Sequence, residues 1–229
     1  NAESARLLRP WVPQAQTRLI PNGVEFPQGV GGLRHPHSPT TVLSVGRLER
    51  GKGVDTLLRS WPSVVSCFPD ARLLIVGSGT QGEELRCLAK HLGVHAHVHF
   101  AGAVHHSQVA AYYTQCACFV QASHAEGISN SLLEAIAHRV PVVVSAVPGN
   151  TDVISNCATG LVFPAGDASA LATAIISILR NPSEARMRAG SAYEHAARCY
   201  DITHVAARYV ELYQELRRQR SLRNPRCGW

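Results

Sequence analysis

The sequence predicts an α/β protein with a doubly wound, Rossmann-like parallel sheet. Short apolar runs alternate with helical patterns from Thr40 onward, and glycine-containing turns follow several of the runs. This alternation is typical of parallel strands joined by crossover helices that cover both faces of the sheet. Because ligands bind at the carboxyl ends of the strands in such a sheet, candidate functional residues should lie in the loops after the apolar runs.

Each element is predicted from its local pattern. Short continuous apolar runs are typical of strands that are buried on both faces. The expected strands are 41–45, 72–76, 97–100, 118–121, 141–144 and 160–163. Apolar residues at helical spacing predict helices at 55–68, 83–91, 108–114, 130–138, 151–155, 168–179, 183–199 and 203–220. Ahead of these elements, residues 17–24 predict a short strand and an Asn-Gly turn.

The composition is that of an ordinary globular chain. Of 229 residues, 45% are hydrophobic and 17% charged, and no stretch approaches the ~18 apolar residues of a membrane span. The formal net charge of +6 is mostly arginine, which is frequent between 217 and 226. A solvated helix end is the favoured interpretation, and a peripheral contact with an anionic membrane or a phosphate-bearing acceptor is the alternative. No motif typical of nucleic-acid binding accompanies the charge, so we expect no nucleic-acid partner.

The cysteines and histidines show no spacing typical of a metal site. Seven cysteines are an odd number, and alternation should place Cys116 and Cys118 on one face of a strand as buried thiols. His95, His97 and His99 alternate along an expected strand and are interpreted as surface or strand-end residues. We therefore expect no metal and a reduced, cytoplasmic setting, with the inner face of a membrane as an alternative.

The main candidate site is the stretch 123–135, which links a buried strand to a helix. Either Ser129 or Asn130 can cap this helix, and the unpaired N–H groups and positive dipole end at its start suit a phosphate. Glu126 precedes the helix and Glu134 lies about one turn inside it, where carboxylates could accept hydrogen bonds from sugar hydroxyls. Such acids are often merely solvated, but an idle Glu134 would be costly in a nearly apolar helix.

A second candidate site is the glycine-rich loop 45–53, which carries Arg47 and Lys52 after the first strand. An arginine and a lysine can neutralise the charge that develops on a diphosphate leaving group. A third loop, 77–82, matches the dinucleotide pattern G-x-G-x-x-G. No acidic residue lies between Glu84 and Glu126, where that pattern requires one, so NAD is not expected.

Together these stretches resemble the GT-B, family-4-like glycosyltransferases. The quoted likenesses are S-x-x-E-G…N-S-L-L-E-A at 123–135, G-R-L-x-x-x-K-G at 46–53, V-G-x-G at 76–79, F-x-G-x-V at 100–104 and T-G-x-L-V-x-P-x-D at 159–167. Residues 148–154 resemble the family's G-G-x-x-E loop, with Pro148 for the first glycine and Asp152 for the glutamate. The resemblance covers most of the chain and identifies it with the C-terminal half of a GT-B fold.

The resemblance implies a role for each matched residue. Glu126 would contact the transferred sugar, while Arg47 and Lys52 would stabilise the departing diphosphate. The implied nucleotide-binding positions are Gly46, Gly77, Gly79, Val104, Gly127, Ile128, Ser129, Asn130 and Glu134, the last on the ribose. Histidines at 105 and 106 replace a carboxylate that would suit guanine, which favours UDP or ADP over GDP. No cofactor or metal is implied.

The implied function is transfer of a sugar from an NDP-sugar to an acceptor with retention of configuration. The implied division is 1–39 as an N-terminal fringe and interdomain hinge, 40–200 as the nucleotide-sugar-binding domain, and 201–229 as a helix returning toward the acceptor domain with a basic tail. That N-terminal acceptor domain is not in the sequence. An NDP-sugar epimerase of the same plan and a non-catalytic nucleotide-sugar-binding module are the alternatives.

Overall fold

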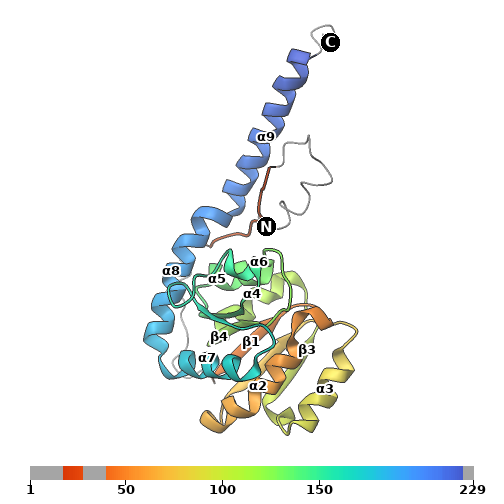
Figure 1. The fold of residues 1–229 in the computed structure, drawn as a ribbon, viewed down its shortest axis with the longest axis vertical. Coiled ribbons are helices and arrows are strands. Elements are labelled where there is room, and N and C mark those ends of the chain that lie inside the picture. The colour runs from red at the N-terminus through yellow and green to blue at the C-terminus, as the bar shows by residue number, and fades with distance from the viewer. Residues whose placement is uncertain (1–17, 28–39, 224–229) are drawn as a thin grey trace.

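Six parallel strands form the centre of the molecule (Figure 1). The computed structural model describes residues 18–27 and 40–223. The strands are β1 (Thr41–Val45), β2 (Arg72–Val76), β3 (Val98–Gly102), β4 (Cys118–Gln121), β5 (Val142–Ser145) and β6 (Leu161–Phe163). Their order in the sheet is β3-β2-β1-β4-β5-β6, and each neighbouring pair is parallel. The predicted doubly wound, Rossmann-like sheet is confirmed.

Side-chain alternation along the strands builds a hydrophobic core on each face of the sheet. In β1, Val42 contributes to the first core and Leu43 to the second. In β4, Cys118 and Val120 belong to the first core and Phe119 to the second. Both faces are therefore covered, which explains why the strands read as continuous apolar runs rather than as an apolar-polar alternation.

Helices supply the other half of each core. The first core is covered by α2 (Val54–Cys67), α3 (Gly82–His91) and α7 (Ala168–Arg180), and the second by α4 (His106–Gln115), α5 (Asn130–Ala137) and α8 (Pro182–Tyr200). Three single-turn elements complete this part: η1 (Arg50–Lys52), η2 (His95–His97) and α6 (Pro148–Thr151). In α7 the buried residues Leu171, Ile175 and Ile178 recur at helical spacing and point one stripe at the sheet.

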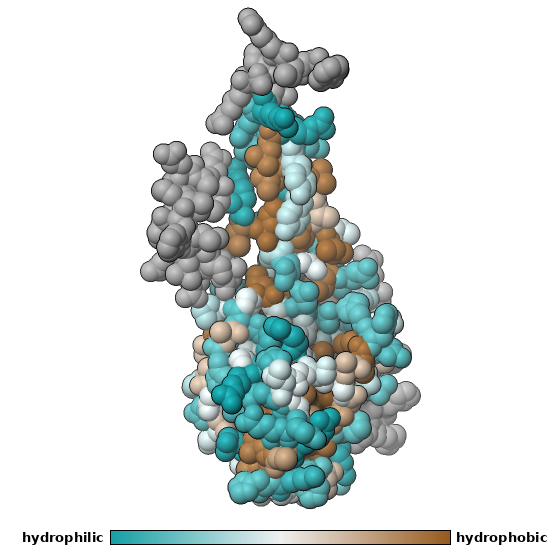
Figure 2. All heavy atoms as spheres, turned by 90° about the vertical axis from the view of Figure 1, so that its right-hand side faces the viewer, coloured by the Kyte–Doolittle hydropathy of each residue, from teal (hydrophilic) through white to brown (hydrophobic). Residues whose placement is uncertain are grey.

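The last helix, α9 (Ile202–Arg223), projects beyond the rest of the molecule (Figure 1). Its 22 residues would span about 33 Å. Large hydrophobic side chains remain exposed along it, namely Tyr209, Val210, Tyr213 and Leu216. Figure 2 shows brown, hydrophobic patches on this projecting helix. The base of α9 is held by Val24, whose carbonyl accepts from Ile202 N–H at 2.9 Å and whose N–H donates to Tyr200 O at 3.0 Å. In the part of the chain that the structure describes, no helix is long and apolar enough to cross a bilayer.

Two of the predicted secondary-structure elements are wrong. The described part of 17–24 is irregular, and Val24 forms only a single bridge, with Asp201. The helix expected at 151–155 lies earlier, at α6, because Pro148 occupies the first turn, where a proline needs no N–H partner. Of the predicted N-terminal fringe and basic tail, residues 1–17, 28–39 and 224–229 lie outside the described residues.

The histidines and cysteines also depart from the expected pattern. His95 and His97 lie in the single turn η2, and of the three alternating histidines only His99 is in β3. Cys116 and Cys118 are both buried, as expected, but they lie on opposite faces of the sheet. Cys116 ends α4 before the strand begins, so strand alternation does not apply to it.

Candidate functional site

The two predicted loops meet where the strand order reverses. β1 and β4 are neighbours in the sheet, although β2 and β3 lie between them in the chain. The loop 46–53 leaves the carboxyl end of β1, and the loop 122–129 leaves that of β4. They enclose a cavity of about 450 Å³, which is lined by Gly46, Arg47, Lys52, Gln121, Ser123, Glu126, Ser129, Asn130 and Ser131 among others. This topological switch point is where α/β sheets bind ligands.

Backbone contacts hold these loops together. The His124 N–H donates to the Gly51 carbonyl at 2.9 Å. Gly53 has a φ of 62°, and a Cβ at that position would lie 2.0 Å from the Ala122 carbonyl oxygen. Only glycine combines this left-handed conformation with so close an approach. The turn after Lys52 therefore lies directly against the strand end that precedes Glu126.

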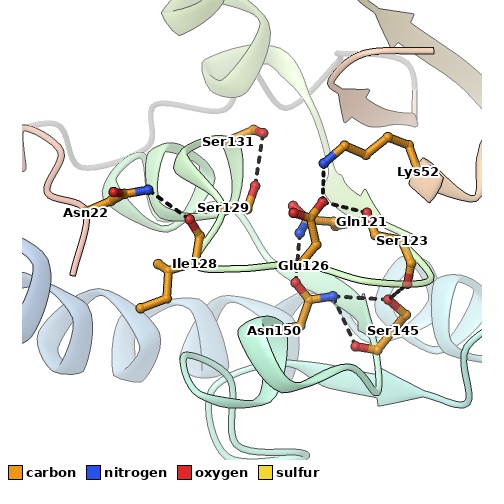
Figure 3. Close-up of polar contacts among 10 residues, drawn as sticks. All are labelled: Asn22, Lys52, Gln121, Ser123, Glu126, Ile128, Ser129, Ser131, Ser145 and Asn150. Carbon is orange, nitrogen blue, oxygen red and sulfur yellow. Dashed lines mark hydrogen bonds and ion pairs between the residues drawn. The ribbon is translucent and has the colours of Figure 1, made fainter. Parts of the chain in front are cut away.

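Lys52 and Glu126 form an ion pair inside the cavity (Figure 3). Lys52 Nζ lies 2.5 Å from Glu126 Oε1, and the Ser123 hydroxyl donates to the same oxygen at 2.8 Å. Only 11% of the Glu126 side chain is exposed, against 29% for Lys52. A charge-assisted bond of this kind is short and strong. The predicted leaving-group lysine and sugar-binding glutamate are thus brought together, each neutralising the other's charge.

Arg47 lies exposed at the cavity edge, near the Glu49 carboxylate, which has other hydrogen-bond partners. The Thr80 hydroxyl and N–H donate to Glu49 at 2.6 and 3.2 Å, and they lower the pKa of that carboxyl, with a smaller contribution from Arg47. Glu49 thereby joins the β1 loop to the turn after β2. Arg47 carries a full positive charge at the mouth of the cavity, where an anionic ligand could reach it.

The start of α5 provides backbone N–H groups at the cavity wall. Ser129 is the N-cap residue, as predicted, but its side chain caps no N–H; its oxygen instead lies 3.2 Å from the Ser131 hydroxyl. The first N–H groups of α5 thus donate no hydrogen bond to the N-cap side chain, and they lie at the positive end of the helix dipole. From the other side, Asn22 donates to the Ile128 carbonyl at 3.1 Å and fixes the last part of the loop (Figure 3).

Glu134 faces a second hollow rather than the cavity that contains Glu126. This hollow, of about 570 Å³, is lined by His106, Tyr113, Asn130, Glu134 and His138 among others. Asn130 lines both spaces, so the two are adjacent. The Tyr113 hydroxyl donates to Glu134 Oε2 at 3.1 Å and approaches the Ser131 carbonyl at the same distance. Burial, together with the charge of Glu134, raises the pKa of Tyr113 well above its usual range.

Besides Glu134, five predicted residues do not line the cavity of the two loops: Gly77, Gly79, Val104, Gly127 and Ile128. Gly77 and Gly79 instead give close backbone contact between the β1 and β2 turns: a Cβ would lie 1.9 Å from the Gly46 carbonyl oxygen and 2.4 Å from that of Leu48, respectively. Val104 packs its side chain against the second core. Of the predicted glycines in these turns, Gly46 is the one that lines the cavity.

The sequence did not single out a buried polar network beneath the cavity. Gln121 Nε2 donates to Asn150 Oδ1 at 2.7 Å, and Asn150 Nδ2 reaches the Ser145 carbonyl and hydroxyl at 3.1 Å each (Figure 3). Ser145 in turn donates to the Ser123 carbonyl at 2.6 Å. A sequence signal does exist, since Gln121 and Ser145 are polar residues that end buried apolar strands. Asn150 carries no such signal.

No cluster of three or more His, Cys, Asp or Glu side chains with the geometry of a metal site occurs within 18–27 and 40–223. The cavity itself is lined by two cations, a carboxylate, hydroxyls and the N-terminal end of α5. Two cations and a helix N-terminus can hold a diphosphate, and a buried carboxylate beside them can accept hydrogen bonds from a sugar.

Comparison with known proteins identifies the family. The model of the family "Glycosyl transferases group 1" matches residues 30–195. A phosphatidyl-myo-inositol mannosyltransferase of Mycobacterium leprae is 36% identical over 203 residues, which cover 85% of this chain and 52% of that protein. Sucrose-phosphate synthase from Thermosynechococcus elongatus superposes with a TM-score of 0.81 at 31% identity, over 94% of this chain and 57% of that one.

A second similar structure extends the likeness in fold. Anabaena HepE, solved with UDP and glucose, superposes with a TM-score of 0.76 at 21% identity, over 86% of this chain and 56% of its own. The chain thus spans about half the length of each of these proteins. Because the family model matches most of the chain, and the cavity forms from two of the stretches that carry the resemblance, the chain belongs to the group 1 glycosyl transferases.

Proposed function

We propose that this chain is the nucleotide-sugar-binding part of a retaining glycosyltransferase. The observation that carries the proposal is the cavity at the switch point, where Arg47, Lys52, Glu126 and the start of α5 come together. Family membership supports the reaction class. We assign residues 40–200 to the domain that binds the sugar nucleotide. The acceptor, which the sequence does not identify, would be bound by a second domain of the whole enzyme.

The proposed reaction breaks the bond between the anomeric carbon of the sugar and the diphosphate oxygen and forms one from that carbon to the acceptor, whose nucleophilic group gives up a proton as the diphosphate leaves. Negative charge develops on that oxygen, so Arg47, Lys52 and the N–H groups of α5 would stabilise the transition state more than the ground state. Glu126 would exchange its bond from Lys52 for hydrogen bonds from sugar hydroxyls as the diphosphate takes over the lysine. Glu134, held by Tyr113 in the adjacent hollow, would accept from the ribose hydroxyls.

The base preference remains as proposed from the sequence, with UDP or ADP ahead of GDP. His106 Nδ1 lies 4.0 Å from Glu134 Oε1, so an imidazole stands beside the proposed ribose site where a carboxylate would suit guanine. HepE was solved with UDP and glucose, which makes UDP the first probe to use. A peripheral contact with the inner face of a membrane stays a proposal that rests on the arginines near the C-terminus.

Calorimetric titration of the chain with UDP, ADP and GDP tests the proposal. One diphosphate should bind, more tightly than its monophosphate, and its affinity should be unchanged by EDTA or magnesium because the proposed contacts use no metal. Incubation of the matching sugar nucleotide without acceptor should leave the sugar unchanged, whereas an isomerised sugar would favour the epimerase alternative. Absence of binding to all three diphosphates by the folded chain would refute the proposal.

Two variants assign the binding to the proposed residues. Arg47→Ala should weaken diphosphate binding by roughly 10- to 100-fold, the value of a hydrogen bond to a charged group. Glu134→Ala should weaken the diphosphate and the free nucleoside alike, because it would remove a ribose contact. Arg198→Ala and Glu194→Ala are matched controls on the exposed side of α8, where neither side chain lines the two hollows. Unchanged affinity in Arg47→Ala or Glu134→Ala would remove that residue from the site.

A further inference from the structure

The loop that carries Glu126 rests on α6, the single turn from Pro148 to Thr151. A Cβ on Gly149 would lie 1.8 Å from the Gly127 carbonyl oxygen and 2.5 Å from that of Glu126. No side chain fits into that space, so the backbones of α6 and the loop are in direct contact. The position of the Glu126 backbone is therefore set in part by an element that begins more than twenty residues later in the chain.

The neighbouring residue Asn150 adds a directional connection to the same loop. Asn150 is fully buried, and its amide uses both ends: Oδ1 accepts from Gln121 and Nδ2 donates to the carbonyl and hydroxyl of Ser145. Ser145, also fully buried, donates to the Ser123 carbonyl, and the Ser123 hydroxyl donates to Glu126 Oε1. Hydrogen bonds thus connect Asn150 through Ser145 to the Ser123 backbone, and the side chain of the same Ser123 continues the connection to the Glu126 carboxylate (Figure 3).

The side chains in this hydrogen-bond network are more specific than packing alone would require. A buried amide loses its bonds to water and is tolerated only when its polar atoms find partners. At position 150, an aspartate could not donate to Ser145, and an aliphatic residue could neither accept from Gln121 nor donate to Ser145. A polar network whose members all have partners fixes one arrangement of the groups that it joins. Here the groups at its upper end are the carbonyl of Ser123 and the carboxylate of Glu126.

We propose that Asn150 and Ser145 are positioning residues that set the place of the Glu126 carboxylate for the sugar of the bound nucleotide. The inference rests on the proposed function, because it gives Glu126 the sugar as its ligand. The diphosphate contacts have separate supports: Lys52 lies on η1, Arg47 follows β1, and the loop end at Ile128 is held by Asn22. Loss of the network should therefore affect the sugar part of the ligand and spare the diphosphate part.

The test is a comparison of affinities for UDP and UDP-glucose in the full chain, or for the ADP or GDP pair if titration selects that base. Ser145→Ala removes the bond to the Ser123 carbonyl and leaves the Ser145 carbonyl for Asn150. It should lower the affinity for the sugar nucleotide relative to the diphosphate by about 2- to 10-fold, the value of one hydrogen bond. Asn150→Ala breaks more of the network and should have a larger effect on the same ratio.

Ser60→Ala provides a matched control for stability. Ser60 is as buried as Ser145 and also donates to a backbone carbonyl, that of Leu57 at 2.7 Å, but it lies in α2 and lines neither hollow. It should reduce the melting temperature comparably and leave the affinity ratio unchanged. If Asn150→Ala does not fold, Ser145→Ala with this control decides the question.

The possible results separate the inference from the proposed function. A lower ratio in Ser145→Ala, with UDP affinity kept, supports positioning. An unchanged ratio, or equal loss of both ligands, overturns it, because the network would then serve the fold alone. If the unaltered chain binds no diphosphate and no sugar nucleotide, the proposed function itself is wrong and the inference falls with it.

Discussion

Lys52 and Glu126 give the cavity an electrostatic character that neither residue has alone. Their ion pair cancels most of the local charge, and the Ser123 hydroxyl holds the same carboxylate oxygen. In the proposed site a diphosphate would therefore compete with Glu126 for the lysine, while Arg47 at the cavity edge would bind it without breaking this ion pair. Affinity for the diphosphate alone and affinity for the sugar nucleotide should accordingly respond in opposite ways to a change at Glu126.

Glu126→Gln tests this competition. The amide keeps the size of the side chain but no longer holds the lysine by charge, so Lys52 becomes more available to phosphate oxygens. We expect UDP, or the diphosphate that binds, to bind about 2- to 10-fold more tightly, with the sugar nucleotide losing its relative advantage. Calorimetry measures both affinities, and Glu194→Gln on α8 is the control. Weaker diphosphate binding would mean that Glu126 supports the phosphate site itself.

The elements around the site are in close contact at glycines, where the absence of a side chain lets two backbone segments approach each other. Gly77 has a φ of 136°, and its missing Cβ makes room for the Gly46 carbonyl, so the β2 turn supports the β1 turn that carries Arg47. Gly149 does the same for α6 and the Glu126 loop. The pattern G-x-G after β2 thus has a packing reason here, which is independent of any ligand.

Gly77→Ala should destabilise the chain by roughly 2–4 kcal/mol, because a strained φ and a backbone clash add together. Gly51→Ala is the matched control: no atom lies within 4 Å of the place that its new methyl group would occupy, and its φ is not in the left-handed region. We expect it to change the free energy of unfolding by less than about 0.5 kcal/mol. Urea denaturation measures both variants, and equal stability of the two would contradict the role assigned to Gly77.

At the scale of the whole molecule, Tyr113 ties the second hydrophobic core to the hollow that contains Glu134. Its ring is buried in that core with Leu132 and Leu133, stacks on His138 at 5.4 Å, and its hydroxyl reaches Glu134. Burial raises its pKa, so the folded protein keeps the phenol proton at a pH where the unfolded chain releases it. The stabilisation from Tyr113 is complete below the ordinary tyrosine pKa and is lost as the pH rises above it.

The free energy of unfolding should therefore fall above about pH 10, with Tyr113 contributing up to about 1.4 kcal/mol per pH unit. Tyr113→Phe should make this decline less steep and lower the stability at neutral pH by about 1–3 kcal/mol, because the partly buried acceptors at Glu134 and Ser131 lose their donor. Urea denaturation between pH 7 and pH 11 gives both quantities. An unchanged alkaline slope would show that Tyr113 does not control it and would direct attention to Tyr200, whose pKa burial also raises.

The fold class and most element positions could be predicted from the sequence because they depend on local patterns. Apolar runs and helical spacing repeat within a few residues, and their alternation leaves a parallel sheet as the arrangement that buries both strand faces. The errors in element position occur where a local feature outweighs the apolar pattern. Pro148 starts α6 earlier than predicted, and Cys116 caps α4 instead of lying in the next strand.

The candidate site divides in the same way. The two loops with Arg47, Lys52 and Glu126 could be predicted as candidates because they follow parallel strands, whose carboxyl ends bind ligands in such sheets. That the ends of β1 and β4 are adjacent was decided by the strand order of the folded sheet. Tertiary structure decided which side chains interact with which. Lys52 pairs with a glutamate 74 positions away, Gln121 with an asparagine 29 positions away, and Glu134 on one helix with Tyr113 on another. Such partners are chosen by the packing of distant elements, since a buried polar atom bonds to whichever group the fold brings within reach, and no local pattern records that choice.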